Sequence, residues 1–198
     1  FLFVIGLTVQ AAMAQSEALW LRYPSISPDG KTFYSASPSS STVVALDISN
    51  PSLPRMLWMG NYPSHGLSIS KDGNRAYLAT IGTFNGTESG VVVLDVSEIQ
   101  ARKANPQVKQ VSAITWDTVS IPQNAIPVVL GGKPHLIEVD EYSRAESSFS
   151  FIASNGPLVG AARIIDISNE AKPKVVGNMR LAVHSKANRA QIANDPGA

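Results

Sequence analysis

The sequence predicts an all-β fold in which a unit of four short strands recurs about three times. Two elements, each repeated along the chain, carry this prediction. The composition agrees, because 44% of the 198 residues are hydrophobic and the chain is rich in the valine, isoleucine, serine, glycine and proline that favour strands and turns. A period near 40 residues with about four strands per unit is typical of a β-propeller blade. We therefore expect a partial β-propeller of about three antiparallel blades.

The first repeated element is a turn between two strands. Residues 26–34 (ISPDGKTFY) match residues 69–77 (ISKDGNRAY) in Ile, Ser, Asp, Gly and Tyr at the same places. An Asp-Gly pair between two β-rich runs is a strong hairpin signal, since a two-residue type I′ loop needs positive φ angles that these residues tolerate. The second copy therefore predicts a two-residue loop at Asp72 and Gly73.

The second repeated element is an apolar strand that ends in Asp-x-Ser. It occurs at residues 43–49 (VVALDIS), 91–97 (VVVLDVS) and 162–168 (ARIIDIS). We expect the Asp at each strand end to accept a hydrogen bond from the backbone N–H two residues on. Residues 91–94 are apolar on both faces, which a strand between two stacked sheets requires.

The repeats divide the chain into three expected blades, at about residues 20–62, 63–115 and 116–181. In the third blade, Gly131 and Gly132 replace the Asp-Gly turn. Two insertions lengthen the period, one at residues 98–106 and the other at residues 143–160. Propellers close with at least about four blades, so we expect the polar residues 182–198 to lead into a missing next blade of the same chain. The alternative is a self-contained β-sandwich, which does not demand a repeated motif.

The N-terminal residues predict export. Residues 1–14 combine an apolar stretch with small residues, which is the pattern of a secretory signal. The stretch is too short to span a bilayer of roughly 30 Å, so we interpret it as the remnant of a cleaved signal and expect no stable membrane span. The protein would then be extracytoplasmic: periplasmic, secreted or on the cell surface. The net charge of +1 and the lack of a basic run argue against nucleic-acid binding.

The three Asp-tipped strands resemble a known repeat. The segments VVALDISNP, VVVLDVS and RIIDISN are similar to the LVIVD repeat of secreted or surface bacterial propeller proteins. The turns SPDGK and SKDGN resemble those of periplasmic and WD-like propellers. The resemblance implies a propeller fold and an extracytoplasmic location, and it implies no particular activity.

Two histidines are candidates for a ligand site on the propeller axis. His65 precedes the first strand of the second blade, which would place it near the entrance of the central channel. His184 follows the third blade and could lie at a related level. As a transition-metal ligand or a general base, each would need partners from other blades. The bland interpretation is a hydrogen-bonded loop histidine.

A group of acidic residues in the third blade is the other candidate. Glu138 and Asp140 alternate along one predicted strand, so both carboxylates share a face, and Glu141 follows. Such a group could hold Ca²⁺, which prefers several oxygen ligands. The alternatives are a solvated face or an ion pair with Arg163.

The leading functional hypothesis is an exported propeller that binds a protein, a glycan or a small ligand at one rim. The alternative is an enzyme with a metal-assisted site on the axis, to which His65 and carboxylates would contribute. No phosphate-binding glycine loop, zinc-protease helix, dinucleotide fingerprint or nucleophile elbow is present in the sequence. We therefore favour binding over catalysis.

Overall fold

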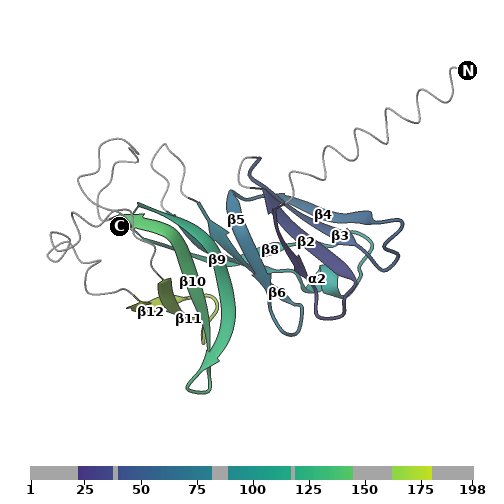
Figure 1. The fold of residues 1–198 in the computed structure, drawn as a ribbon. Helices are drawn as coiled ribbons and strands as arrows, with labels where there is room; N and C mark the ends of the chain where they lie inside the picture. The colour runs from purple at the N-terminus through teal and green to yellow at the C-terminus, as the bar shows by residue number, and fades with distance from the viewer. Residues whose placement is uncertain (1–21, 38–39, 82–88, 117–118, 145–161, 180–198) are drawn as a thin grey trace, which may run out of the picture.

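The computed structural model describes residues 22–37, 40–81, 89–116, 119–144 and 162–179 (Figure 1). Within these ranges the chain forms three four-stranded antiparallel sheets and one short helix. The predicted all-β propeller fold is therefore confirmed, whereas a β-sandwich would contain two sheets. The expected signal remnant at 1–14 and the tail at 182–198 lie outside the described residues.

Each sheet joins its four strands in chain order. Sheet A contains β1 (Arg22–Ile26), β2 (Thr32–Ser37), β3 (Thr42–Asp47) and β4 (Arg55–Asn61). Sheet B contains β5 (Ser64–Ile69), β6 (Arg75–Thr80), β7 (Ser89–Asp95) and β8 (Lys109–Trp116), with helix α2 (Ser97–Gln100) between the last two strands. Sheet C contains β9 (Val119–Leu130), β10 (Lys133–Arg144), β11 (Ala162–Asp166) and β12 (Lys174–Met179).

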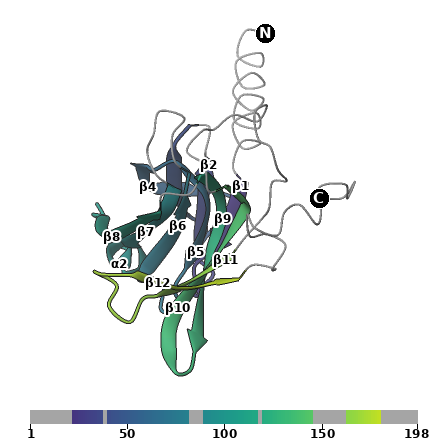
Figure 2. The ribbon, with the colours of Figure 1, turned by 90° about the vertical axis from the view of Figure 1, so that its left-hand side faces the viewer.

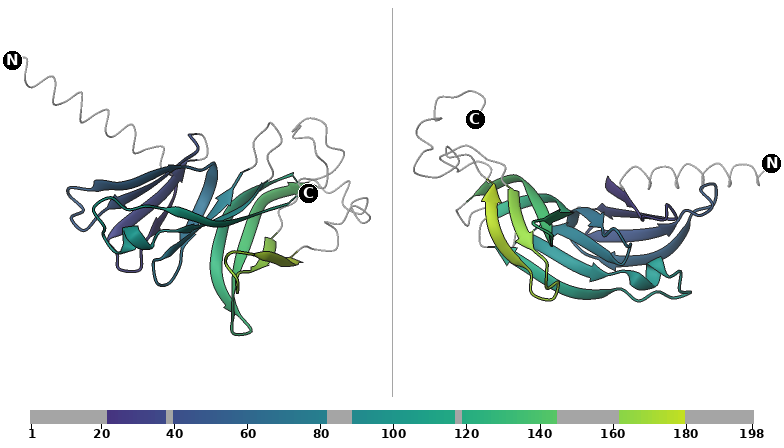
Figure 3. Two further views of the ribbon diagram at one scale, coloured as in Figure 1. Left: turned by 180° about the vertical axis from the view of Figure 1, so that it is seen from behind. Right: turned by 90° about the horizontal axis from the view of Figure 1, so that it is seen from below.

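The three sheets lie next to one another in the order A, B, C, with sheet B in the middle (Figure 1). The first strand of sheet B, β5, contacts the first strand of each neighbouring sheet, β1 and β9. Figure 2 looks onto sheet C, behind which the other sheets lie, and both views of Figure 3 show the same order. First strands that meet in this way are the inner strands around a propeller axis.

Two separate apolar clusters hold the sheets together. The cluster between sheets A and B includes Tyr34 from one side and Leu78 and Leu94 from the other. The cluster between sheets B and C includes Val91 and Val93 together with residues of β9, β10 and β11. Strand β7 therefore buries one face against each neighbour, which explains why its apolar run lacks the alternation of a half-exposed strand.

The predicted hydrogen bonds at the three Asp-tipped strand ends are present. In each case the backbone N–H of the serine donates to Oδ1 of the aspartate, which ends the strand in an Asx turn. The distances are 2.9 Å for Ser49 to Asp47, 2.9 Å for Ser97 to Asp95 and 2.7 Å for Ser168 to Asp166.

The prediction of a two-residue loop at Asp72 and Gly73 is wrong. Strand β5 ends at Ile69 and β6 begins at Arg75, and only Gly73 of the pair has a positive φ, of 78°. Hydrogen bonds of the Ser70 hydroxyl and the Asp72 carboxylate with residues of the same loop stabilise a connection that is longer than two residues. The type I′ geometry occurs instead at Gly131 and Gly132, whose φ angles of 55° and 76° join β9 to β10.

The backbones of β5 and β9 approach closely at Gly66. A Cβ atom there would lie 2.1 Å from the carbonyl oxygen of Gln123. We expect Gly66→Ala to lower the free energy of unfolding by about 1–3 kcal/mol, because the backbone must move to relieve the overlap. Chemical denaturation measures this change. Gly177→Ala is the matched control, since its Cβ would meet only the Ile164 side chain at 3.6 Å or more; equal losses for the two variants would contradict the prediction.

The outward faces of sheets A and C carry exposed apolar side chains. On sheet A, Ile26 and Met56 are 55% and 58% exposed, and on sheet C, Ile126 is 44% exposed and lies opposite Ile137. Sheet B covers only the opposite faces of sheets A and C, so in a closed propeller further sheets would pack on these exposed faces. Among the described residues, no helix has the length and hydropathy to cross a bilayer.

Candidate functional site

Three of the predicted site residues meet in the interface between sheets B and C. Arg163 Nη1 on β11 lies 2.7 Å from Glu138 Oε2 and 2.7 Å from Asp140 Oδ2, both on β10. The exposed fractions of the three side chains are 3%, 0% and 0%. We call Glu138, Asp140 and Arg163 the charged cluster.

Strand pairing and a neighbouring ring position the charged cluster. Glu138 and Arg163 are direct cross-strand partners, and the alternation along β10 puts Asp140 on the same face. From sheet B, the ring of Trp116 lies 4.0 Å from Arg163 Cζ, a cation–π contact. The guanidinium is thus enclosed by two carboxyl groups and an aromatic face.

Two carboxyl groups share one guanidinium in this buried place. Burial, followed by the neighbouring Asp140 carboxyl group, raises the pKa of Glu138 to about 8, although Arg163 acts in the opposite direction. At neutral pH the protonated form of Glu138 is therefore favoured, and the pair of carboxyl groups holds a proton.

The charged cluster replaces an apolar pair of the repeat. In sheet B the counterparts of Glu138 and Arg163 are Leu78 and Val92, which are also cross-strand partners. Leu78 is fully buried in the cluster between sheets A and B. Sheet B forms the same strand pair with apolar residues, so the repeat does not require charge here. Burying charges also costs more free energy than burying apolar side chains of similar size. The sequence signal was the alternation of Glu138 and Asp140 along one strand, with Arg163 as a possible ion-pair partner.

The other candidates lie nearer the inner strands. His65 lies within strand β5, and not before it as was expected. It is half-buried, and its Nε2 lies 3.2 Å from Nε2 of Gln123 on β9. The same Gln123 amide donates to Glu141 Oε2 at 3.0 Å. Gln123 was not predicted, because nothing in the sequence marks it. His184 lies outside the described residues.

Within the ranges that the structure describes, no group of three or more histidine, cysteine, aspartate or glutamate side chains is placed to hold a metal ion. Ca²⁺ or a transition metal therefore remains a prediction of the sequence alone.

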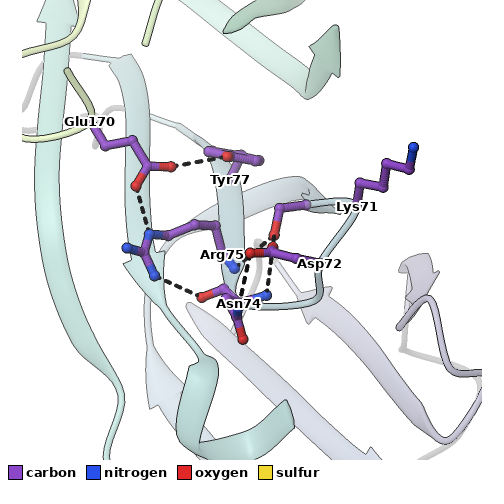
Figure 4. A pocket seen from close by; sticks show the side chains of 7 residues that line it. Lys71, Asp72, Asn74, Arg75, Tyr77 and Glu170 are labelled. Carbon is purple, nitrogen blue, oxygen red and sulfur yellow. Dashed lines mark hydrogen bonds and ion pairs between the residues drawn. The ribbon is translucent and has the colours of Figure 1, made fainter. Parts of the chain in front are cut away.

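A pocket lies at the opposite end of β5 from His65, where the β5–β6 connection meets sheet C (Figure 4). Its volume is about 630 Å³. Its lining is polar and comes from two sheets: Ser70, Lys71, Asp72, Asn74, Arg75, Tyr77 and Glu170. We call it the seam pocket.

An ion pair between the two sheets forms one wall of the seam pocket. Arg75 Nε donates to Glu170 Oε2 at 2.7 Å, and the Tyr77 hydroxyl donates to Glu170 Oε1 at 3.2 Å (Figure 4). Arg75 Nη1 also lies 3.4 Å from Asp95 Oδ1. Burial and then the Glu170 carboxylate raise the pKa of Tyr77, so its hydroxyl keeps its proton.

The opposite wall is the closed loop after β5. Asp72 accepts hydrogen bonds from the Ser70 hydroxyl at 2.6 Å, from the Asn74 backbone at 3.1 Å and from the Asn74 side chain at 2.8 Å. These bonds, the serine one first, lower the pKa of Asp72 and keep it ionised. Sequence reasoning treated this segment only as a turn, and it did not connect it with Glu170.

Comparison with known proteins supports the repeat and the fold. The LVIVD repeat model matches residues 40–62 and 148–180. Among solved structures, the chain is similar to hydrazine synthase from Kuenenia stuttgartiensis, with 20% identity and a TM-score of 0.54 over 81% of this chain and 37% of that one. It is also similar to a proposed 6-phosphogluconolactonase from Bacteroides uniformis, with 14% identity and a TM-score of 0.52 over 81% of this chain and 40% of that one.

A second proposed 6-phosphogluconolactonase, from Bacteroides fragilis, matches at 14% identity and a TM-score of 0.52. The match covers 81% of this chain and 39% of that one. The chain thus spans about two fifths of the length of these structures, and the likeness concerns the fold alone. No curated protein matches the sequence significantly.

Proposed function

We propose that this chain, which carries LVIVD repeats and folds as part of a β-propeller, is an extracytoplasmic binding module whose seam pocket takes a small polar ligand. One observation carries the proposal: a pocket of about 630 Å³ whose lining residues come from two sheets. This volume lies within the range of small-molecule sites in proteins. The secretory pattern of residues 1–14 and the LVIVD repeats favour the location.

Three charged residues of the seam pocket, Lys71, Arg75 and Glu170, are not required by the repeat, although Ser70, Asp72 and Tyr77 recur in it. In the matching turn of sheet A, Pro28 stands in place of Lys71 and Thr32 in place of Arg75. Ile99 occupies the position after the second Asp-tipped strand that Glu170 occupies after the third. The same fold is therefore built without these charges at the interface of sheets A and B, which supports a role beyond folding.

Rigid elements hold the seam pocket open. Arg75 and Tyr77 are on β6, a strand paired on both sides, and Glu170 follows β11 in the turn toward β12. A ligand would meet side chains that are already fixed by hydrogen bonds, so little conformational entropy is lost on binding.

The test is a ligand screen on the wild-type chain and two variants. A panel of small sugars, amino acids and organic acids is screened by thermal shift, and each ligand that binds is measured by calorimetry. We expect Arg75→Gln to weaken binding of such a ligand at least about 10-fold, because the wall between the sheets loses its ion pair. Arg102→Gln is the matched control: both arginine side chains are 28% exposed and ion-paired, but Arg102 pairs with residues of sheet A. The proposal fails if no ligand binds or if Arg75→Gln binds as tightly as wild type.

A further inference from the structure

We propose that the outward face of sheet A binds the outward face of sheet C of a second copy of this chain, and that two copies close one ring of sheets. Sheets A and C lie on opposite sides of sheet B, so each has one face turned away from the rest of the described chain (Figure 1). The inference goes beyond the proposed function and does not depend on it, because the seam pocket lies between sheets B and C of a single copy.

The outward face of sheet A is apolar across all four strands. One row of cross-strand partners consists of Ile26, Phe33, Leu46 and Met56. Met59 lies in the next row of the same face and is 64% exposed. Monomeric proteins rarely expose large contiguous apolar patches, so we expect a partner to cover this face.

The outward face of sheet C is apolar as well. Its central row of cross-strand partners consists of Ile126, Ile137 and Ile164. The neighbouring row contains Val139 and Met179, which are 37% and 53% exposed. Each copy therefore has an apolar face at both ends of its row of sheets.

The outward face of sheet A corresponds to the face by which sheet B packs on sheet A. The repeat aligns Ile26 with Ile69, and Leu46 with Leu94. Leu94 is fully buried in the apolar cluster between sheets A and B, and Ile69 packs against that cluster. The outward face of sheet A thus has the character of a face that packs on a preceding sheet.

The outward face of sheet C corresponds to the opposite face of sheet B. The cross-strand pair of Ile137 and Ile164 aligns with the pair of Tyr77 and Val93. Tyr77 and Val93 are buried in the cluster between sheets B and C. The outward face of sheet C therefore has the character of a face that receives a following sheet. The two outward faces are the two halves of an interface that the chain already forms twice.

A second copy supplies both halves of this interface at once. Each segment of the sequence outside the described ranges is shorter than the about 40 residues of a propeller sheet. Sheet C of one copy can instead bind sheet A of the other, and a twofold axis repeats this contact, so both outward faces of each copy are covered. With three sheets from each copy, the ring falls within the range of roughly four to eight sheets in closed propellers.

The mass of the 198-residue chain in solution tests the inference. We expect sedimentation velocity at several concentrations to give the mass of two copies for the wild type. Ile26→Glu and Ile126→Lys each place a charge on one outward face, at side chains that are 55% and 44% exposed and that a single copy can therefore replace. We expect each variant by itself to have the mass of one copy, because both contacts of the ring would then bury an unpaired charge.

A mixture of the two variants separates loss of the interface from loss of the fold. In a mixed pair, one contact has two wild-type faces and the other has a glutamate on one face and a lysine on the opposing one. We therefore expect an equimolar mixture to regain the mass of two copies. Circular dichroism verifies that each variant is folded.

Val129→Lys is the matched control, and we expect it to keep the mass of two copies. Val129 is 72% exposed and lies on the same strand as Ile126. The two residues are three positions apart, so they lie on opposite faces of the sheet.

The inference is overturned if the wild-type chain has the mass of one copy at every concentration, which would assign the outward faces to further sheets or to another protein. Assemblies larger than two copies would overturn it as well, because the contact would then not close into a ring. A mixture that stays at the mass of one copy, or a Val129→Lys variant that dissociates as readily as Ile126→Lys, would also overturn it.

Discussion

Replacing Arg163 by valine, the residue at the corresponding position of sheet B, is expected to lower the free energy of unfolding by about 3–5 kcal/mol at neutral pH. The Arg163 side chain is 3% exposed and compensates two carboxyl groups that are 0% exposed. Without it, Asp140 has lost its positive partner in a place that water does not reach. Urea denaturation at pH 7 measures the loss.

A compensating variant shows whether unpaired charge is the cause. Glu138→Leu, Asp140→Thr and Arg163→Val together introduce the residues of sheet B: Leu78, Thr80 and Val92. We expect this triple variant to be at least as stable as wild type, because an apolar replacement of a buried ion pair is often neutral or stabilising. A single variant as stable as wild type, or a triple variant as unstable as the single one, would contradict this account.

Glu138→Gln is expected to remove a dependence of stability on pH between about 4.5 and 8. Because burial in the folded state raises the pKa of Glu138 to about 8 from its ordinary value of 4.5, the unfolded chain releases this proton at a lower pH than the folded protein does. Between these values the folded state binds more protons, so the stability of the wild type falls as pH rises. Each pKa unit corresponds to about 1.4 kcal/mol, so the total loss is several kcal/mol.

The glutamine variant has no such proton to lose. Its amide can donate to Asp140 and accept from Arg163, as the protonated Glu138 does, so we expect a flat profile over this range and greater stability than wild type at pH 8. Denaturation curves at several pH values measure both profiles. Glu141→Gln is the control, since Glu141 is on the same strand and exposed. A wild type equally stable at pH 5 and pH 8 would show that Glu138 does not hold the proton.

A different pH range belongs to the turn aspartates. Hydrogen bonds from the following serine, first in each case, lower the pKa values of Asp47, Asp95 and Asp166. A carboxyl group with a lowered pKa stabilises the folded state above its unfolded value and loses this contribution as pH falls. Their effect is therefore confined to acid conditions and does not overlap with the loss due to Glu138.

The interface between sheets B and C differs from that between sheets A and B along its length. It contains the charged cluster among its buried residues and the seam pocket where the β5–β6 connection meets sheet C. Leu78 and Thr32 occupy two of the matching places in the other interface. The charged cluster and the charged residues of the seam pocket are therefore departures from the repeat, which agrees with the general rule that a fold hosts sites without fixing them.

Local signals in the sequence explain the predictions that succeeded. The Asx turns at Asp47, Asp95 and Asp166 depend on a side chain and a backbone N–H two residues apart, so the sequence contains everything they need. The stacking of β7 between two sheets followed from its apolar faces. The prediction of a two-residue loop at Asp72 and Gly73 was wrong, because hydrogen bonds of the Ser70 hydroxyl stabilise a longer loop. These bonds outweigh the preference of an Asp-Gly pair for a two-residue turn.

The sequence by itself determined the strands, their repeat and the need to bury both faces of the middle strands, because hydrophobic periodicity and turn chemistry act over a few residues. Only the tertiary structure decided that Glu170 would reach Arg75, that Gln123 would join His65 to Glu141, and that Glu138 would face Arg163. These contacts join segments from different strands, and in two of the three from different sheets. Their partners are fixed by strand register and sheet stacking, and no short window of sequence contains either.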